Sequence, residues 1–220
     1  MSYSVREVFF TVQGEGCLAG TPAVFVRFAG CNLWSGREQD RATGKGACAR
    51  WCDTDFVGGN KFSADEIVEQ CLSVSSHQVR VKRWVVLTGG EPALQIDSSL
   101  LFALRGRGFS VAVETNGAVN NPALAIADWL TLSPKLGGEV TLTVCPGELK
   151  VVLPGVVDGE GWSDKQLEAL AGRFEGAVLT VQPQDNHDQG AAAVARCVDF
   201  VNRHDGWRIG VQAHKFWKLP

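Results

Sequence analysis

The stretch Trp84–Pro92 reads WVVLTGGEP, and it contains the pattern that decides the fold. Its first half is an apolar, valine-containing run, which is typical of a buried strand. Its second half begins with a glycine pair and ends in proline, and such residues predict a turn. We therefore expect a buried strand that ends in a polar, glycine-rich loop.

Strand-like and helix-like segments alternate along the chain on both sides of this stretch. Ala23–Phe28 (AVFVRF) is apolar and β-branched, as expected for a strand. Ser63–Leu72 has Ser63 at its start and Glu66 three residues later, which is a capping box, and its apolar residues fall on one helical face. This alternation predicts an α/β fold with a mainly parallel sheet covered by helices. The other expected strands are 109–117, 130–135, 149–153, 177–185 and 207–216, and the other expected helices are 98–108, 163–174 and 191–204.

Several of the expected strands end in a polar or glycine-rich signature. The endings are TGGEP, ETNG, SPK, QPQD and QAHK. Because the carboxyl ends of strands form the site in parallel barrels and open α/β sheets, we expect these endings to line one polar pocket. Any one of them could be an ordinary turn, since turns favour the same residues. The set of all five predicts a site.

Composition and charge limit the classes of protein to consider. The chain of 220 residues is 45% hydrophobic and 20% charged, which is ordinary for a globular protein. Its net charge of −3 argues against a nucleic-acid partner bound through a broad basic surface. No apolar run approaches the roughly 20 residues of a membrane span, and the amino end lacks the shape of a secretory signal. We therefore expect a cytoplasmic protein with no membrane partner, and we interpret residues 1–220 as a single domain.

Cysteines form the most unusual feature of the composition. The chain has seven, an odd number with uneven spacing, so a disulfide framework is not expected. Cys31, Cys48 and Cys52 lie in a polar stretch, and the last two are spaced to share one face of a helical turn. Three thiolates without a nearby fourth ligand suit an iron–sulfur cubane with one open iron better than tetrahedral zinc. The alternative is a set of buried, inert thiols, which is what we expect of Cys17, Cys71, Cys145 and Cys197.

The strand endings and the three cysteines, in this order, resemble the radical S-adenosylmethionine superfamily. TGGEP is similar to the motif that holds the amino group of S-adenosylmethionine, and Glu114 of ETNG to the residue that binds its ribose. Gly90 is expected to let the backbone approach closely where a Cβ would obstruct. The resemblance implies a [4Fe–4S] cluster on Cys31, Cys48 and Cys52. The cofactor-binding residues that it implies for S-adenosylmethionine are Trp51, Gly89, Gly90, Glu91, Glu114, Ser133, Pro134, Lys135, Gln182, Pro183, Gln184 and Asp185.

Within that superfamily the chain resembles the 7-carboxy-7-deazaguanine synthases over essentially its full length. Phe9–Gly16 (FFTVQGEG), the segments FVRFAGCNLW and CDTDF, and Val211–Pro220 (VQAHKFWKLP) carry this resemblance. The superfamily usually spaces its cysteines compactly, whereas here sixteen residues separate the first two and three separate the last two. The long first gap matches an expanded cluster loop, about residues 31–54, that some members of this family carry. The second gap is one residue wider than expected, which alters the local loop geometry.

The family resemblance implies ring contraction of 6-carboxy-5,6,7,8-tetrahydropterin to 7-carboxy-7-deazaguanine with loss of ammonia, a step towards queuosine. The radical forms on the cofactor, so no catalytic residue is assigned on the protein, which orients the reactants and excludes water. The backbone of Val12–Gly14 and the Glu15 carboxylate fit the heterocycle, and Arg27 offers a bidentate match to the substrate carboxylate unless it forms an ordinary salt bridge. Thr54 resembles a Mg²⁺ ligand. The substrate-binding residues implied are Val12, Gln13, Gly14, Glu15, Arg27, Thr88, His214 and Pro220.

The same resemblance implies a partial, modified (β/α) barrel with helices outside, because a full barrel needs eight units and about 250 residues. The tail 211–220 is expected to close the substrate site, with the apolar residues of FWKLP as anchors. A homodimer and a one-electron donor such as flavodoxin or ferredoxin are also implied. Two alternatives stay open. One is a radical activase that makes a glycyl radical on a partner protein, and the other is a non-catalytic, zinc-stabilised binding domain.

Overall fold

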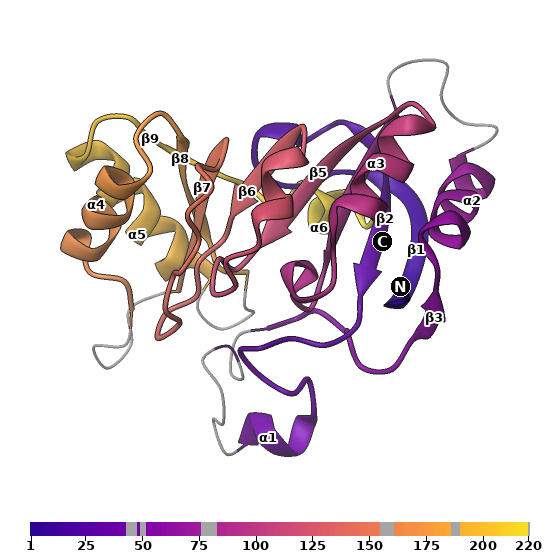
Figure 1. Ribbon diagram of the computed structural model, residues 1–220. Coiled ribbons are helices and arrows are strands. Elements are labelled where there is room, and N and C mark those ends of the chain that lie inside the picture. Colours follow the sequence, from indigo (N-terminus) through magenta and orange to yellow (C-terminus); the bar gives the residue numbers. More distant parts are fainter. Residues whose placement is uncertain (43–47, 49–51, 76–82, 155–160, 186–189, 220) are drawn as a thin grey trace.

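The computed structural model describes residues 1–42, 48, 52–75, 83–154, 161–185 and 190–219. Within these ranges a single sheet of nine strands has the order β3-β1-β2-β4-β5-β6-β7-β8-β9 (Figure 1). The strands are β1 (Tyr3–Val12), β2 (Pro22–Phe28), β3 (Asn60–Phe62), β4 (Arg83–Gly89), β5 (Phe109–Thr115), β6 (Trp129–Leu132), β7 (Glu148–Leu153), β8 (Val178–Pro183) and β9 (Trp207–Ile209).

The sheet is parallel from β2 through to β9, and at the other end β1 runs antiparallel to both of its neighbours, β2 and β3. It ends in open edges at β3 and β9, so it is a partial barrel, as predicted. Sequence analysis assigned no element to β1, because its sequence YSVREVFFTV mixes charged and apolar residues without a clean alternation. Pairing with β2 over most of its length makes this segment a strand.

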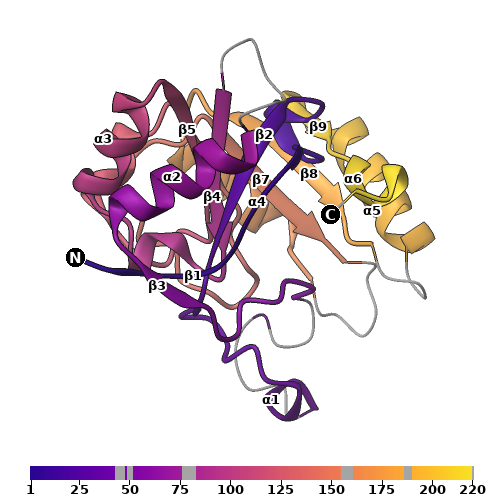
Figure 2. The same ribbon diagram turned by 90° about the vertical axis from the view of Figure 1, so that its right-hand side faces the viewer.

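Helices cover the outer side of the sheet, with α2 and α3 near one end and α4 and α5 near the other (Figures 1 and 2). The predicted capping box is present at α2, where Glu66 accepts from the Ser63 backbone at 2.7 Å. A second capping box joins Ser163 and Gln166 at the start of α4. The helices are α1 (Glu38–Ala42), α2 (Ala64–Ser75), α3 (Ser98–Gly106), α4 (Asp164–Arg173), α5 (Gly190–Arg203) and α6 (Ala213–Trp217), with short 3-10 turns η1 (Gly16–Leu18), η2 (Pro92–Leu94) and η3 (Pro122–Ile126).

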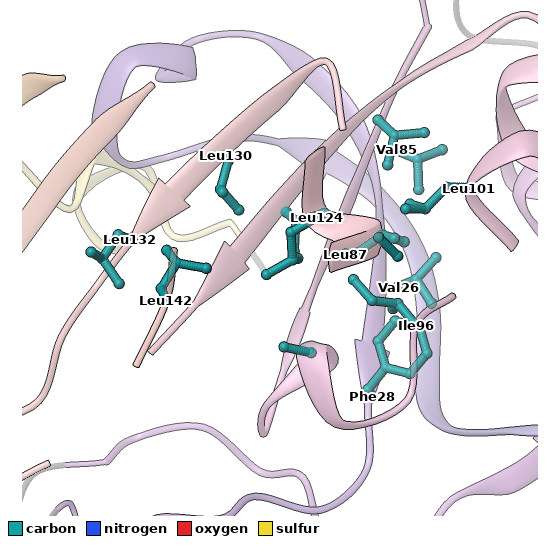
Figure 3. Packing of buried hydrophobic residues seen from close by; sticks show 14 of the residues in the cluster. Val26, Phe28, Val85, Leu87, Ile96, Leu101, Leu124, Leu130, Leu132 and Leu142 are labelled. Atoms are coloured by element: carbon teal, nitrogen blue, oxygen red, sulfur yellow. The ribbon is translucent and has the colours of Figure 1, made fainter. Parts of the chain in front are cut away.

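The two faces of the parallel strands differ, because successive side chains of a strand point to opposite sides. One face packs against the helices and forms the hydrophobic core. Figure 3 shows Val26, Val85 and Leu87 of this face beside Leu101 of α3 and Leu124 of η3. The other face carries the polar residues of the strands. The fold therefore separates an apolar outer layer from a polar interior.

The carboxyl-terminal segment differs from the prediction. Residues 207–216 were expected to form one strand, but β9 ends at Ile209 and α6 begins at Ala213. Gly210 still packs closely on β8, because its N–H donates to Val181 O at 2.8 Å and a Cβ there would lie 2.8 Å from Thr180. Of the proposed apolar anchors, Phe216 is 86% exposed and Trp217 is 47% exposed, which contradicts the prediction for these two, whereas Leu219 is partly buried. In the part of the chain that the structure describes, no helix is long and apolar enough to span a membrane.

Candidate active site

The carboxyl ends of the parallel strands open into a cavity of about 730 Å³. All five polar strand endings contribute to its lining, although QAHK does so from α6 and the turn before it. Two of the predicted residues, Glu91 and Pro183, do not line this cavity, and two others, Trp51 and Pro220, lie outside the described residues. The predicted residues that do line it are Val12, Gln13, Gly14, Glu15, Arg27, Cys31, Cys48, Cys52, Thr54, Thr88, Gly89, Gly90, Glu114, Ser133, Pro134, Lys135, Gln182, Gln184, Asp185 and His214.

The glycine turn after β4 packs directly on the chain that leads to Cys31. Gly90 N donates to Phe28 O at 3.0 Å, and Glu91 N donates to Gly30 O at 2.9 Å. A Cβ on Gly90 would lie 1.9 Å from Gly30 O, which is impossible without displacing one of the two segments. The need for glycine here thus arises first from packing within the protein, and not only from an approach to a cofactor.

Glu91, which the resemblance assigns to the cofactor, has its carboxylate engaged within the protein. It is fully buried. One carboxylate oxygen accepts from Ala93 N at 2.9 Å and from Thr115 Oγ1 at 2.7 Å, and the other accepts from Asn116 N at 2.7 Å. Burial raises the pKa of Glu91, and these hydrogen bonds offset part of the rise. The side chain therefore joins the TGGEP turn to the ETNG turn.

The three cysteines surround a small apolar cluster at the rim of the cavity. Trp34 and Phe56 meet edge to face at 5.8 Å, and Cys48 is buried between them and their neighbours. Cys31 and Cys52 are partly buried against the same cluster. Cys52 N donates to Cys48 O at 3.0 Å, and the residues between them lie outside the described ranges. Cys17 and Cys145 contradict the expectation for the other thiols, because Cys17 is only partly buried and Cys145 is exposed.

The thiol environment fits a cluster that supplies positive charge. Burial raises the pKa of Cys48 to about 12, Lys135 lowers it, and the neighbouring Cys31 and Cys52 raise it further. Such thiols become ligands only when a metal stabilises the thiolate. Among the described residues, no three His, Cys, Asp or Glu side chains stand close enough to hold one metal ion. A cubane takes one thiolate on each of three irons, whereas a structural zinc takes four ligands, so the number of thiols suits a cubane.

Thr54 lies in the cavity wall between two aspartates that are already engaged. Asp53 accepts from Lys215 Nζ at 2.8 Å, and Asp55 pairs with Arg6 at 2.7 Å. The Thr54 hydroxyl is therefore the group that this short segment offers to a ligand in the cavity. A single hydroxyl is compatible with Mg²⁺, which keeps waters and takes oxygen atoms from a substrate.

Buried charged groups form the floor of the cavity, and one of them was missed by sequence analysis. Lys150 on β7 pairs with Glu15 and lies 3.4 Å from Glu114. Burial alone would raise the pKa of Glu15, but Lys150 and a hydrogen bond from Gln212 bring it down to about 2. The apolar run LKVVL by itself does not indicate that Lys150 faces a polar interior. The available signal was the period-two alternation from Glu148, which places Glu148 and Lys150 on the same face of the strand.

Gln182 supports a ligand in this cavity. Its side chain is 1% exposed, and neither its amide nitrogen nor its amide oxygen has a well-formed hydrogen bond among the described residues, although the amide lies close enough to Glu15 to help lower the pKa of that carboxyl. A buried polar group without a partner is costly and calls for an explanation. A zwitterionic cofactor would give this amide both a donor and an acceptor, so the residues present fit S-adenosylmethionine.

The VQGEG segment is covered by α6. Ala213 N donates to Gly14 O at 2.8 Å, and a Cβ on Gly14 would lie 2.4 Å from His214 Nδ1. The backbone N–H and C=O of Gln13 bond to Thr21 and Gly20. The backbone groups that were expected to pair with the heterocycle are therefore largely engaged within the protein. Helix α6 brings His214 to the cavity instead.

Arg27 forms a salt bridge and also faces the cavity, so it is compatible with both interpretations that the sequence left open. It lies on β2 and lines the cavity. Its Nε is 2.6 Å from Glu7, and its guanidinium lies 5.7 Å from the centre of the Phe9 ring. The salt bridge is real, and the side chain still faces the cavity.

The chain is similar in fold to a crystal structure of QueE from Escherichia coli, with a TM-score of 0.70, 25% identity, and coverage of 97% of this chain and 95% of that chain. No protein-family model matches the chain. Relatives called 7-carboxy-7-deazaguanine synthase are 42% identical in Burkholderia multivorans and 44% identical in Caulobacter vibrioides, each over 100% of both chains. A third, from Bradyrhizobium diazoefficiens, is 43% identical over 98% of both.

A parallel partial barrel whose strand ends and three rim cysteines meet at one cavity is the architecture of a radical S-adenosylmethionine enzyme. The similarity to the curated relatives extends over the full length of this chain and theirs. The chain belongs to the 7-carboxy-7-deazaguanine synthase family.

Proposed function

We propose that the chain catalyses ring contraction of 6-carboxy-5,6,7,8-tetrahydropterin to 7-carboxy-7-deazaguanine with loss of ammonia. One observation carries the proposal: five polar strand endings and three thiols converge on a single cavity of about 730 Å³. Family membership supports the same reaction. The reaction is redox-neutral overall, because the product and ammonia together contain all the atoms of the pterin.

The protein's part in this chemistry is to bind, orient and exclude water. When bound, a [4Fe–4S] cluster and S-adenosylmethionine supply the radical that takes hydrogen from C6 of the pterin. Cys31, Cys48 and Cys52 would hold the cluster. The cofactor would lie along the TGGEP, ETNG, SPK and QPQD turns, with Gln182 and Glu114 as its buried polar contacts.

The substrate would occupy the end of the cavity that β1, β2 and α6 enclose. Glu15 would accept from the guanidine-like edge of the pterin, because its low pKa keeps it ionised. Arg27 would take the substrate carboxylate, and Thr54 would hold Mg²⁺ beside it. His214 and Thr88 line the same region, and the tail 211–220 would close it. The electron donor would be a small one-electron carrier of the flavodoxin or ferredoxin type, and the protein would act as a homodimer formed from single-domain chains.

The decisive experiment is anaerobic incubation of the reconstituted protein with reductant, S-adenosylmethionine and the carboxylated pterin. Chromatography with mass spectrometry should detect 7-carboxy-7-deazaguanine, and ammonia should form in equal amount. Cleavage of the cofactor without a deazapurine, together with modification of an added polypeptide, would favour the activase instead. Colourless protein that contains zinc and cleaves no cofactor would favour the binding domain.

A further inference from the structure

Lys150 is a buried cation at the floor of the cavity, between the two halves of the proposed site. We propose that Lys150 is a positioning residue that holds Glu15 and Glu114 together and thereby couples binding of the substrate to binding of the cofactor. This inference rests on the proposed function, which gives Glu15 to the pterin and Glu114 to S-adenosylmethionine.

The geometry gives each carboxylate two fixed partners. The Lys150 side chain is 3% exposed, and its Nζ donates to Glu15 Oε2 and lies 3.4 Å from Glu114 Oε2. The other oxygen of Glu15 accepts from Gln212 Nε2 at 2.7 Å. The other oxygen of Glu114 accepts from Gln13 Nε2, also at 2.7 Å. One cation therefore orients both carboxylates, and the amides of Gln212 and Gln13 each bind the remaining oxygen of one carboxylate.

Lys150 acts here as a fixed positive charge and does not transfer protons. Burial alone would lower its pKa, but Glu114 and Glu15 raise it well above its ordinary value. The same pairing lowers the pKa of Glu15 to about 2, against the effect of burial. Both partners stay ionised across the neutral range, so neither exchanges a proton with the reactants in ordinary turnover.

Glu148 also contributes to the raised pKa of Lys150, but its hydrogen-bond and ion-pair partners are other groups. Glu148, two residues earlier on the same face of β7, is 1% exposed. It accepts from Thr180 Oγ1 at 2.7 Å and from Cys17 N at 3.0 Å, and Arg208 on β9 lies 3.3 Å away. Since Arg208 already serves Glu148, the cation available to Glu15 and Glu114 within the described residues of this floor is Lys150. His214 on α6 is the other titratable group near the VQGEG segment.

Removal of this cation would leave two partly buried carboxylates close together, an arrangement in which one of them takes up a proton. The pKa of Glu15 would rise, and the substrate would lose its ionised acceptor. Glu114 would lose a partner at the same time, so the cofactor would also bind more weakly. A residue that served one ligand alone would affect only one of the two affinities.

The test compares wild-type holoenzyme with the variants Lys150→Met and Lys150→Arg, reconstituted anaerobically. Lys150→Met should raise the KM for the pterin by about tenfold for each unit by which the pKa of Glu15 exceeds the pH, and it should raise the KM for S-adenosylmethionine as well. The KM for the pterin should fall as the pH rises, because Glu15 ionises again, and kcat should change less. Lys150→Arg should restore most of the wild-type values. Lys165→Met, an exposed lysine on α4, is the matched control.

A second readout does not depend on turnover. In protein labelled with ¹³C at the glutamate carboxyl carbons, the Glu15 signal is assigned by its loss in Glu15→Gln. It should stay ionised through mildly acidic pH in the wild type and titrate at higher pH in Lys150→Met. Lys150→Gln, which keeps an amide donor without the charge, replaces the Met variant if that variant does not fold.

An unchanged KM for either ligand in the charge-removing variant, or an unshifted Glu15 signal, would overturn the inference. A wild-type enzyme that makes no deazapurine would defeat the proposed function alone, since the carboxylate titration would still report on Lys150.

Discussion

Two regions of the cavity bury ionisable groups, and burial affects them in opposite ways. In the floor, Glu15 lies beside Lys150 and its pKa falls to about 2. At the rim, Cys48 lies in an apolar cluster and its pKa rises to about 12. The two pKa values move in opposite directions because of the positive charge nearby. In the floor, Lys150 stabilises the ionised form of Glu15, whereas the positive charge near Cys48 does not offset the effect of burial. The floor is complete in the protein alone, whereas the rim becomes charged only when metal is bound.

The largest effect should come from the rim. Cys48→Ala removes one of three thiolates, and because the cubane has no substitute ligand there, we expect the visible absorption of the cluster to disappear. Cleavage of S-adenosylmethionine should become undetectable while the far-ultraviolet circular dichroism changes little. Cys145→Ser, at an exposed thiol, is the control and should retain both properties. A Cys48→Ala protein that is still brown after anaerobic reconstitution would contradict the role of Cys48 as a cluster ligand.

The parallel strands and their polar endings were predictable because they follow local rules. Apolar runs mark strands that are buried on their helix-facing side, and glycine or amide residues mark where those strands stop. Ser63 with Glu66 predicted the start of α2 from two side chains.

What could not be predicted depends on contacts between distant segments. Lys150 lies in an apolar strand, and only the partners from β5 and the segment after β1 make its burial tolerable. Residues 213–217 are helical because they dock on Gly14, which is about 200 residues earlier in the chain. The resemblance assigns Glu91 to the cofactor, and its carboxylate also accepts hydrogen bonds from the turn after β5, which the sequence does not reveal. In each case the long-range contact outweighs the local pattern.

The glycine turn that connects the two regions should give the next largest effect. A Cβ at Gly90 would be 1.9 Å from Gly30 O, so Gly90→Ala must displace the chain just before Cys31. We expect a loss of about 1–3 kcal/mol in the free energy of unfolding, with reduced cluster loading, measured by chemical denaturation and iron content.

Gly106→Ala is the matched control for this change. Gly106 is the last residue of α3, and a Cβ there would meet no atom within 4 Å. Alanine is the better helix former, so this variant should be neutral or slightly more stable, by up to about 1 kcal/mol. Equal effects at the two glycines would mean that the packing of the Gly90 turn on the chain before Cys31 does not stabilise the protein.

The smallest effect should come from the ion pairs that tether α6 to the rim. Lys215 lies 2.8 Å from Asp53 and 3.5 Å from Asp185, but its side chain is 31% exposed and theirs are 66% and 57% exposed. Exposed pairs of this kind are worth up to about 1 kcal/mol and are screened by salt. Lys215→Ala should therefore lower the free energy of unfolding only slightly, and a double-mutant cycle with Asp53→Asn should give a coupling that vanishes at high salt. A salt-independent coupling would show that α6 is held as firmly as the floor. The comparison of Lys150 with Lys215 would then no longer show that a lysine charge contributes more when it is buried than when it is exposed.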